Sequence, residues 1–413
     1  METLGSIVRA ALMFLILICG LYPITRFPWV TLLLRIGLLV WLFVNVFLMF
    51  YLRMNGRDTS IGGLVGTASF VCNGITNIII ILESMLHDNH AKIMHQLEDE
   101  IFYIFKRHFH KRIEELEKLR HKMSKEILAI FCIELICIGF KLWINAISSI
   151  QPVFWQAFPT SVSLRVRYIQ IIAIVIKFNG HGEIFKHYLK LSTTDKTPSN
   201  AVGLWQPYKD EEYAQLNARR LIYLRIWEMF KSLNDAFGWS ILYLFITSFF
   251  DIVCNCYWTF TAGYKGQVFH KYVFNGATSI SLSSLVITLF YYTDTSYKNS
   301  RYIGCLISKL VKQPLGNKRY NDLVSEFSVQ TLHQRFIVTA KEFFALNLGL
   351  LGSMVAAIVT YLVILIQFMF TEKSNGDSKI SSSKLETTTI ANTLLFTTSA
   401  VNSTILDMFE NNN

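Results

Sequence analysis

The stretch LNLGLLGSMVAAIVTYLVILIQF, from Leu346 to Phe368, decides the class of fold. It contains no Asp, Glu, Lys or Arg, and as an α-helix it would span about 34 Å, enough to cross the hydrocarbon core of a bilayer. The composition of the 413-residue chain agrees, because 52% of the residues are hydrophobic and only 16% are charged. A soluble protein carries about a quarter charged residues. The sequence therefore predicts an all-α membrane protein.

Seven apolar runs are long enough to be transmembrane helices. The predicted spans are 28–52, 61–84, 127–150, 163–186, 237–260, 272–293 and 346–369. An earlier run, 10–24, would span only about 22 Å as a helix and is followed by Pro23 and Pro28. It can be a signal peptide, an eighth span, or a lead-in that lies in or on the membrane. We favour the lead-in, which makes 1–27 an N-terminal membrane-associated segment.

The net charge of +10 reflects membrane topology and not nucleic-acid binding. Most Lys and Arg residues fall between alternate spans, in 85–126, 187–235 and 294–342. The positive-inside rule then places the N-terminus inside and the C-terminus outside, the reverse of a G-protein-coupled receptor. Residues 371–413 would form an extracellular flexible tail, in which Asn402 of Asn402-Ser403-Thr404 is a candidate glycosylation site.

The long inner segments combine charged residues with apolar residues at regular spacing. Residues 91–125 and 213–233 carry apolar side chains at helical spacing among charged ones. This pattern predicts amphipathic helices that continue the spans and pack together as a cytoplasmic anchor bundle. Segment 28–345 would thus contain helices 1–6, the ligand pocket and the anchor extensions.

No pattern in the chain points to catalysis, a metal or a cofactor. Six of the ten histidines lie between His87 and His121, and His87, Asp88 and His90 could form a metal site or a general base. Zinc-binding spacings, a P-loop and a nucleophile elbow are all missing from the sequence, so we favour a structural role for this cluster. We expect no enzyme activity and no cofactor. The seven cysteines show no disulfide framework either.

Polar side chains inside the spans have two interpretations. They can hydrogen-bond neighbouring helices, or they can line a ligand pocket that opens outward. Lys141 and Asp251 are candidate partners of each other. The candidate pocket residues, with nearby aromatics, are Ser69, Asn73, Lys141, Trp143, Asn145, Asp251, Asn255, Trp258, Asn275, Thr278 and Ser281.

Residues Leu332 to Phe368 carry a series of paired residues in a fixed order. The pairs are His333-Gln334, Thr339-Ala340, Phe343-Phe344, Leu346-Asn347, Thr360-Tyr361 and Gln367-Phe368. This series resembles the C-terminal signature of insect gustatory receptors, a family related to insect odorant receptors. The match is specific over this segment, while elsewhere only the layout of spans agrees.

The resemblance implies a ligand-gated, non-selective cation channel in the plasma membrane of sensory neurons. Four subunits, either identical or mixed with other gustatory receptor chains, would line one pore with segment 346–370. A small-molecule tastant would open it. In this family a break precedes the pore helix, and Asn347, Gly349 and Gly352 are candidates for it. The sugar-receptor branch carries Glu after the Tyr of the motif, where this chain has Leu362, so a bitter-type or other non-sugar tastant is favoured.

Helix geometry suggests how the motif could gate ions. Thr360, Ile364 and Phe368 share one face, and four copies of that face would form a hydrophobic constriction. Gln367 lies about 100° away, so a rotation would exchange Phe368 for Gln367 in the pore. The alternative is that Gln367 bonds a neighbouring helix. Tyr361 is expected to pack on a neighbouring helix.

Two other functions stay open at this point. One is a metabotropic chemoreceptor of inverted topology, which would need a cytoplasmic partner. The other is a multi-pass transporter or enzyme that uses the histidine segment or Lys141 and Asp251.

Overall fold

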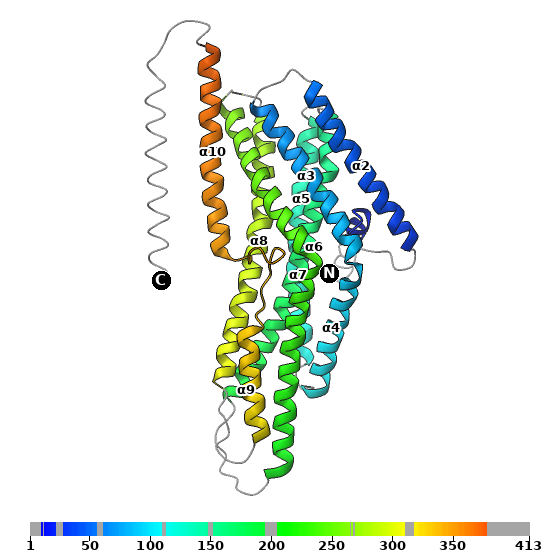
Figure 1. Cartoon of the computed structure of the whole chain (residues 1–413), viewed down its shortest axis with the longest axis vertical. Helices are drawn as coiled ribbons and strands as arrows, with labels where there is room; N and C mark the ends of the chain where they lie inside the picture. The colour runs from blue at the N-terminus through cyan, green and yellow to red at the C-terminus, as the bar shows by residue number, and fades with distance from the viewer. Residues whose placement is uncertain are drawn as a thin grey trace. The chain divides into compact units, whose positions relative to one another are not determined.

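A computed structural model describes most of the chain as a bundle of long helices (Figure 1). The structure describes residues 10, 12–21, 28–55, 61–109, 113–147, 152–194, 205–264, 266, 269–309 and 318–377. Asn402 therefore lies outside the described residues. The helices are α2 (Pro28–Asn55), α3 (Ile61–Leu86), α4 (Asp88–His108), α5 (Ile113–Ile147), α6 (Pro152–Thr194), α7 (Trp205–Tyr264), α8 (Phe269–Ser308), α9 (Lys318–His333) and α10 (Leu348–Asp377).

The chain divides into two units, residues 1–356 and 357–413. The first unit contains α2 to α9 and the start of α10. The second contains the remainder of α10, including Thr360 to Phe368.

Each of the seven predicted spans falls on one helix, in the order α2, α3, α5, α6, α7, α8 and α10. Two predicted bounds differ from the helix ends, because 127–150 extends beyond the end of α5 at Ile147 and 346–369 begins two residues before α10. Six of these are long and apolar enough to cross a membrane by composition. The exception is α6, whose apolar run contains Arg165, Arg167 and Lys177. Arg165 and Arg167 are only 4% and 2% exposed, so α6 keeps its charges inside the bundle.

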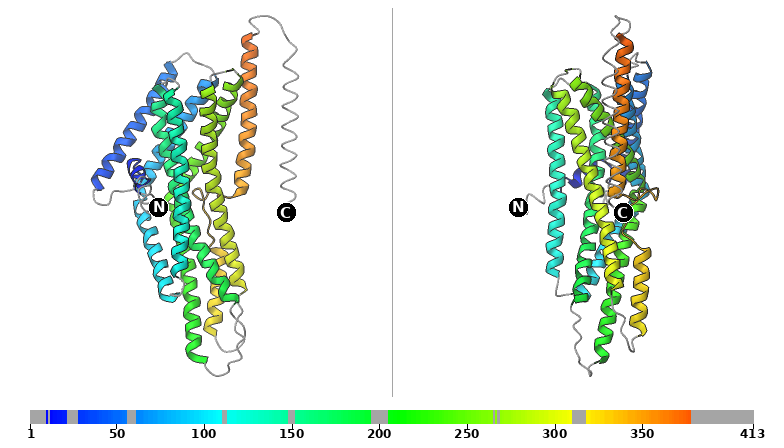
Figure 2. Two further views of the ribbon diagram at one scale, coloured as in Figure 1. Left: turned by 180° about the vertical axis from the view of Figure 1, so that it is seen from behind. Right: turned by 90° about the vertical axis from the view of Figure 1, so that its left-hand side faces the viewer.

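Three helices are longer than a bilayer requires. At 43, 60 and 40 residues, α6, α7 and α8 are about 60–90 Å long, against a hydrocarbon core of about 30 Å. They run side by side in Figure 1 and in both views of Figure 2. The predicted apolar positions of α7 are buried, among them Leu216, Tyr223 and Phe230. The helical extensions therefore pack on one another, as their sequence pattern predicted.

The predicted inner helix 91–125 is in fact two helices. Helix α4 begins at Asp88 and ends in Lys106, Arg107 and His108, so acidic and basic residues match the two ends of its dipole. Its residues Leu97, Ile101 and Phe105 are buried, as their spacing indicated. Residues 113–125 of the segment belong to α5.

The lead-in packs against the bundle. Residues 12–18 are helical and span about 10 Å, too short to cross a bilayer. Ile16 and Leu21 are 6% and 4% exposed. Arg35 of α2 donates from Nε to the Gly20 carbonyl oxygen at 2.8 Å and forms a bidentate pair with Asp88 at 2.7 and 2.9 Å. These contacts support the lead-in among the three interpretations.

The break before the last span lies earlier than predicted. Residues 334–347 are non-helical, and they separate α9 from α10. Asn347 caps α10, because its Oδ1 accepts the Leu350 N–H at 2.8 Å. Gly349 and Gly352 lie inside α10, so assigning the break to them was wrong.

Candidate functional site

One group of predicted pocket residues comes together between α3 and α7. Ser69 Oγ and Asn73 Nδ2 both donate to Asp251 Oδ1, at 2.5 and 3.0 Å. Asn255, one turn further along α7, donates to the Asp251 carbonyl oxygen at 2.6 Å. Asn73 Oδ1 is buried and has no hydrogen-bond partner among the described residues. This cluster therefore offers an unused acceptor beside a carboxylate.

A second cluster joins α5, α6 and α8. Arg165 Nη1 lies 2.7 Å from Glu134 Oε2, and both side chains are at least 96% buried. Ser281 donates to Glu134 Oε1 at 3.1 Å and accepts a short hydrogen bond from Arg165. Lys141 is 6% exposed in the same region. Lys141 and Asp251 form no direct ion pair, but their charges still attract each other, so their partnership stays a prediction.

A third cluster ties α3, α6 and α7 together around Glu83. Its Oε2 lies 3.2 Å from Arg167 Nη2, and its two oxygens accept the Trp239 and Ser240 N–H groups at 2.9 and 3.0 Å. The Arg167 guanidinium also lies 4.3 Å from the centroid of the Phe237 ring. Because every charge is paired and hydrogen-bonded, the cluster can be stable in an apolar interior.

The sequence contained a signal for these two ion pairs that we did not use. Glu83 and Glu134 are acidic residues inside apolar runs, and Arg165 and Arg167 are two of the basic residues in another. Ionisable groups in spans usually pair with each other.

The remaining predicted pocket residues are dispersed. Trp143 is 60% exposed and Asn145 is buried. Trp258 is half-buried, with its ring centroid 5.7 Å from that of Tyr257. Asn275 is half-buried, and the Thr278 hydroxyl donates to the Phe274 carbonyl of its own helix at 2.9 Å.

The non-helical linker 334–347 is fastened to α7. The Asn234 side chain donates to the Ile337 carbonyl at 2.9 Å and accepts the Thr339 N–H at 3.0 Å. Tyr223 donates a short hydrogen bond to the Gln334 carbonyl. Phe336, which follows, is 1% exposed and stacks on Phe230 at 5.4 Å. The linker is thus part of the core and not a surface loop.

The tip of the linker is a tight turn against α7. Ala340 and Phe344 are joined by an N–H···O bond of 3.0 Å, and Lys341 and Glu342 between them have positive φ angles of 48° and 65°. A Cβ atom on Gly238 would lie 3.1 Å from the backbone N and Cα atoms of Lys341. Only glycine lets the turn approach α7 this closely.

The motif residues of this region have different environments. The Phe344 ring centroid lies 5.2 Å from that of Phe245, whereas Phe343 is 69% exposed. His333 is exposed at the end of α9, and the Gln334 side chain accepts from Gln330 at 2.7 Å. Sequence reasoning missed Asn234 and Gly238, which hold the motif in place.

The histidine segment forms no metal centre. Within the described part of the chain, no group of three His, Cys, Asp or Glu side chains could hold a metal ion. His87 and His90 lie with ring centroids 5.3 Å apart, and His90 Nδ1 lies 3.2 Å from Ser232 Oγ. These contacts agree with a structural role for His87 and His90.

Glu98 of α4 contacts α6 through a partly buried ion pair. It pairs with Lys177 through a short contact, and His181 Nε2 lies 3.8 Å from its Oε1. Burial by itself would raise the pKa of Glu98, but His181 and Lys177 outweigh burial and lower the pKa from 4.5 to about 2. The ionised pair therefore stabilises the fold fully above pH 4.5, and this contribution is lost as the pH falls toward 2.

We expect Glu98→Gln to lower the thermal midpoint of the purified protein by an amount that is constant above pH 4.5 and shrinks toward pH 2. The physical reason is that the wild-type carboxylate becomes neutral in that interval. Melting curves of both proteins across the pH range measure it. A difference that stays constant through the acidic interval would contradict the assignment.

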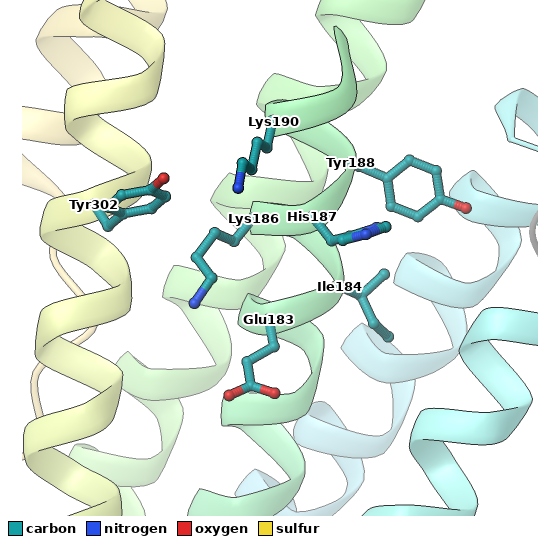
Figure 3. A pocket seen from close by; sticks show the side chains of 7 residues that line it. All are labelled: Glu183, Ile184, Lys186, His187, Tyr188, Lys190 and Tyr302. Atoms are coloured by element: carbon teal, nitrogen blue, oxygen red, sulfur yellow. The ribbon is translucent and has the colours of Figure 1, made fainter. Parts of the chain in front are cut away.

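A cavity of about 580 Å³ is lined by residues 183–190 of α6 and by Tyr302 of α8 (Figure 3). Figure 3 shows Lys186 and Lys190 extending toward Tyr302, with Tyr188 and His187 on the other side of α6. Lys186 Nζ donates to Asn299 Oδ1 at 2.9 Å and lies 5.7 Å from the centroid of the Tyr302 ring. No sequence motif had singled out these residues.

These features define a multi-helix membrane protein with an ionic interior and a docked linker before its last span. The chain belongs to the seven-transmembrane chemosensory receptor family, which matches residues 10–372. Gustatory receptor 23a of Drosophila melanogaster is 40% identical over 228 residues, which cover 53% of this chain and 59% of that protein. The match thus spans less than two thirds of that relative. The predicted relationship to insect gustatory receptors is confirmed.

The fold is similar to that of a solved olfactory receptor. The insect olfactory receptor OR5 from Machilis hrabei aligns with a TM-score of 0.59 and 11% identity, covering 87% of this chain and 97% of that one. Its structure in complex with eugenol aligns with a TM-score of 0.57 and 10% identity, covering 88% and 99%. The predicted seven-helix, all-α membrane fold is confirmed, while the inside position of the N-terminus stays a prediction.

Proposed function

We propose that this chain is a subunit of a ligand-gated, non-selective cation channel that detects taste compounds at the plasma membrane of sensory neurons. The observation that carries the proposal is the linker 334–347, which is hydrogen-bonded to α7 and leads without interruption into the capped helix α10, uncharged from Leu348 to Thr371. Any movement of α7 relative to the linker would be transmitted to α10. Membership of a chemosensory receptor family supplies the context.

In this proposal four subunits, identical or mixed, surround the pore with α10. Leu348 and Val355, in the first turns of α10, are 41% and 52% exposed in the single chain. Exposed apolar side chains along an uncharged stretch of helix, such as Leu348 to Thr371, are suited to contact lipid or other subunits. The N-terminus and the anchor extensions would lie in the cytoplasm, and the tail would lie outside.

The cluster of Ser69, Asn73 and Asp251 is the proposed ligand contact. It combines a carboxylate with the buried, unused acceptor Asn73 Oδ1, so it suits a molecule that donates hydrogen bonds. With Leu362 after Tyr361, we propose a bitter-type or other non-sugar tastant. A panel of such compounds, screened by current in a heterologous cell, would identify it.

Once an agonist is found, Asn73→Leu is expected to raise its half-maximal concentration by about tenfold, because one hydrogen bond to a buried group is lost. The resting current should be unchanged. Thr278→Val is the matched control, since that hydroxyl bonds its own helix. Equal dose–response curves for Asn73→Leu and wild type would exclude this cluster as the ligand contact.

The gate is tested on α10. Phe368→Ala is expected to raise the resting leak, because it removes the largest apolar side chain of the proposed constriction. Gln367→Ala is expected to reduce the open conductance. Leu362→Ala, about 120° from Phe368 around the helix, serves as a control. Patch recordings of resting leak, conductance and selectivity that match wild type in both variants would disprove the gate.

Recordings from excised membrane patches also distinguish a channel from a metabotropic receptor. Ligand-evoked current in excised membrane without G proteins supports a channel. A receptor that signals only in intact cells would disprove it.

A further inference from the structure

A second cavity lies near the point where α3 passes into α4. It has a volume of about 390 Å³ and lies between the lead-in residues 12–21, α4, α6 and α7. Ligand pockets usually measure about 300–1,000 Å³. Ser84 on its wall is about 22 Å along α3 from Ser69, so it is separate from the Asp251 cluster.

The walls of this pocket are mainly apolar. The residues that matter for the argument are Ile16 and Leu21 of the lead-in, Met94, Ile174, Phe178 and Phe237. Residues from four separate segments thus face one space. A flat or elongated apolar molecule would be covered on several sides.

The charged groups of the wall already have partners. Arg167 pairs with Glu83, Asp88 is held by Arg35 at 2.7 and 2.9 Å, and Glu98 pairs with Lys177. His95 lies 3.6 Å from Glu98 and is 74% exposed. A charged ligand would therefore gain no free counterion, which favours a neutral one.

One polar group in the wall is unused. Ser84 is 6% exposed, and its buried Oγ has no hydrogen-bond partner among the described residues. A buried hydroxyl without a partner is unfavourable. A ligand hydroxyl could satisfy it, because a serine hydroxyl both donates and accepts.

We propose that this pocket binds a neutral amphiphile with a single hydroxyl group, such as a long-chain or cyclic alcohol. The ligand hydroxyl bonds Ser84 Oγ, and its apolar body lies between the lead-in and α6. Binding would fasten residues 12–21 to the bundle. The site is independent of the tastant contact at Asn73.

The test uses a ten-carbon primary alcohol with a photoreactive diazirine in its chain. The full chain is labelled in membranes, and the adducts are mapped by mass spectrometry. We expect adducts in 12–21, at Met94 and in 170–178, with protection by unlabelled 1-decanol. The readout does not involve current, so its failure would not affect the proposed channel function.

Two variants make the test specific. Ala173→Phe fills the pocket from α6 and should reduce these adducts at least tenfold, whereas Ala129→Phe, at an exposed position of α5, should not. Ser84→Ala removes the hydroxyl and should raise the decanol concentration for half protection by about 3- to 10-fold. If Ala173→Phe does not fold, the decanol concentration for half protection of Ser84→Ala tests the proposal by itself. Adducts that persist in Ala173→Phe, or half protection unchanged in Ser84→Ala, would overturn the proposal.

Discussion

Replacing Glu83 by glutamine is expected to destabilise the protein by about 3–5 kcal/mol, because it leaves the Arg167 guanidinium buried without a counterion. Both side chains are 98% buried, so water cannot compensate. Glu83 also accepts the Trp239 and Ser240 N–H groups, which an amide would satisfy only in part. Fluorescence-detected size exclusion after heating should show loss of the monodisperse peak at a much lower temperature than for wild type.

Glu100→Gln is the matched control for that result. Glu100 pairs with Arg225 at 2.8 Å, but its side chain is 51% exposed. Exposed pairs contribute about 0–1 kcal/mol, so its melting curve should nearly coincide with that of wild type. If both substitutions shift the midpoint equally, the buried pair has no special role.

Gly238→Ala is expected to release the linker from α7 and abolish ligand-evoked current while the bundle still folds. The new methyl group would lie 3.1 Å from backbone atoms of Lys341, which cannot move aside as a flexible side chain would. Overpacking of this kind costs about 1–3 kcal/mol, enough to shift a two-state docking equilibrium by about 5- to 150-fold. Recordings with an agonist, normalised to surface expression, measure the effect.

Gly182→Ala controls for the loss of a buried glycine. A Cβ there would meet only Phe336 Cε2, at 3.9 Å, which is an ordinary contact. Asn234→Ala should resemble Gly238→Ala, since it removes two hydrogen bonds that hold the linker. Normal agonist currents in both linker variants would show that the docked turn does not couple α7 to α10.

The spans and the helical extensions could be predicted from the sequence because both depend on local composition and period. A run such as 346–369 has to be helical in lipid, whatever its neighbours are. Buried positions such as Tyr223 and Phe230 repeat at helical spacing, which a single sequence displays directly.

The partners of the buried charges could not be predicted in the same way. Arg167 and Glu83 are 84 residues apart, and only the packing of α3, α6 and α7 brings them together. Lys141 and Asp251 had opposite charges at similar depth, yet Glu134 pairs with Arg165. The charge and membrane depth of a residue limit its possible ion-pair partners, but the rotation of each helix about its axis determines which partner it contacts.

The predicted position of the break before the last span was wrong for a different reason. Glycine has a low helix propensity, and for this reason Gly349 and Gly352 were predicted to interrupt the helix. Propensity is weak compared with tertiary contacts, and the linker is held non-helical by Asn234 and Tyr223 of α7. Those two residues lie more than a hundred positions earlier in the chain.

The backbone is strained at Lys341 and Glu342, because both residues have positive φ angles. Each of these residues carries a Cβ in a backbone conformation that costs about 1–2 kcal/mol. Undocking of the linker would return this energy, about 2–4 kcal/mol for both residues, as the backbone relaxes. The contacts of Asn234 and Tyr223 with the linker therefore hold the turn against this strain, and a movement of α7 that breaks them would let the backbone relax.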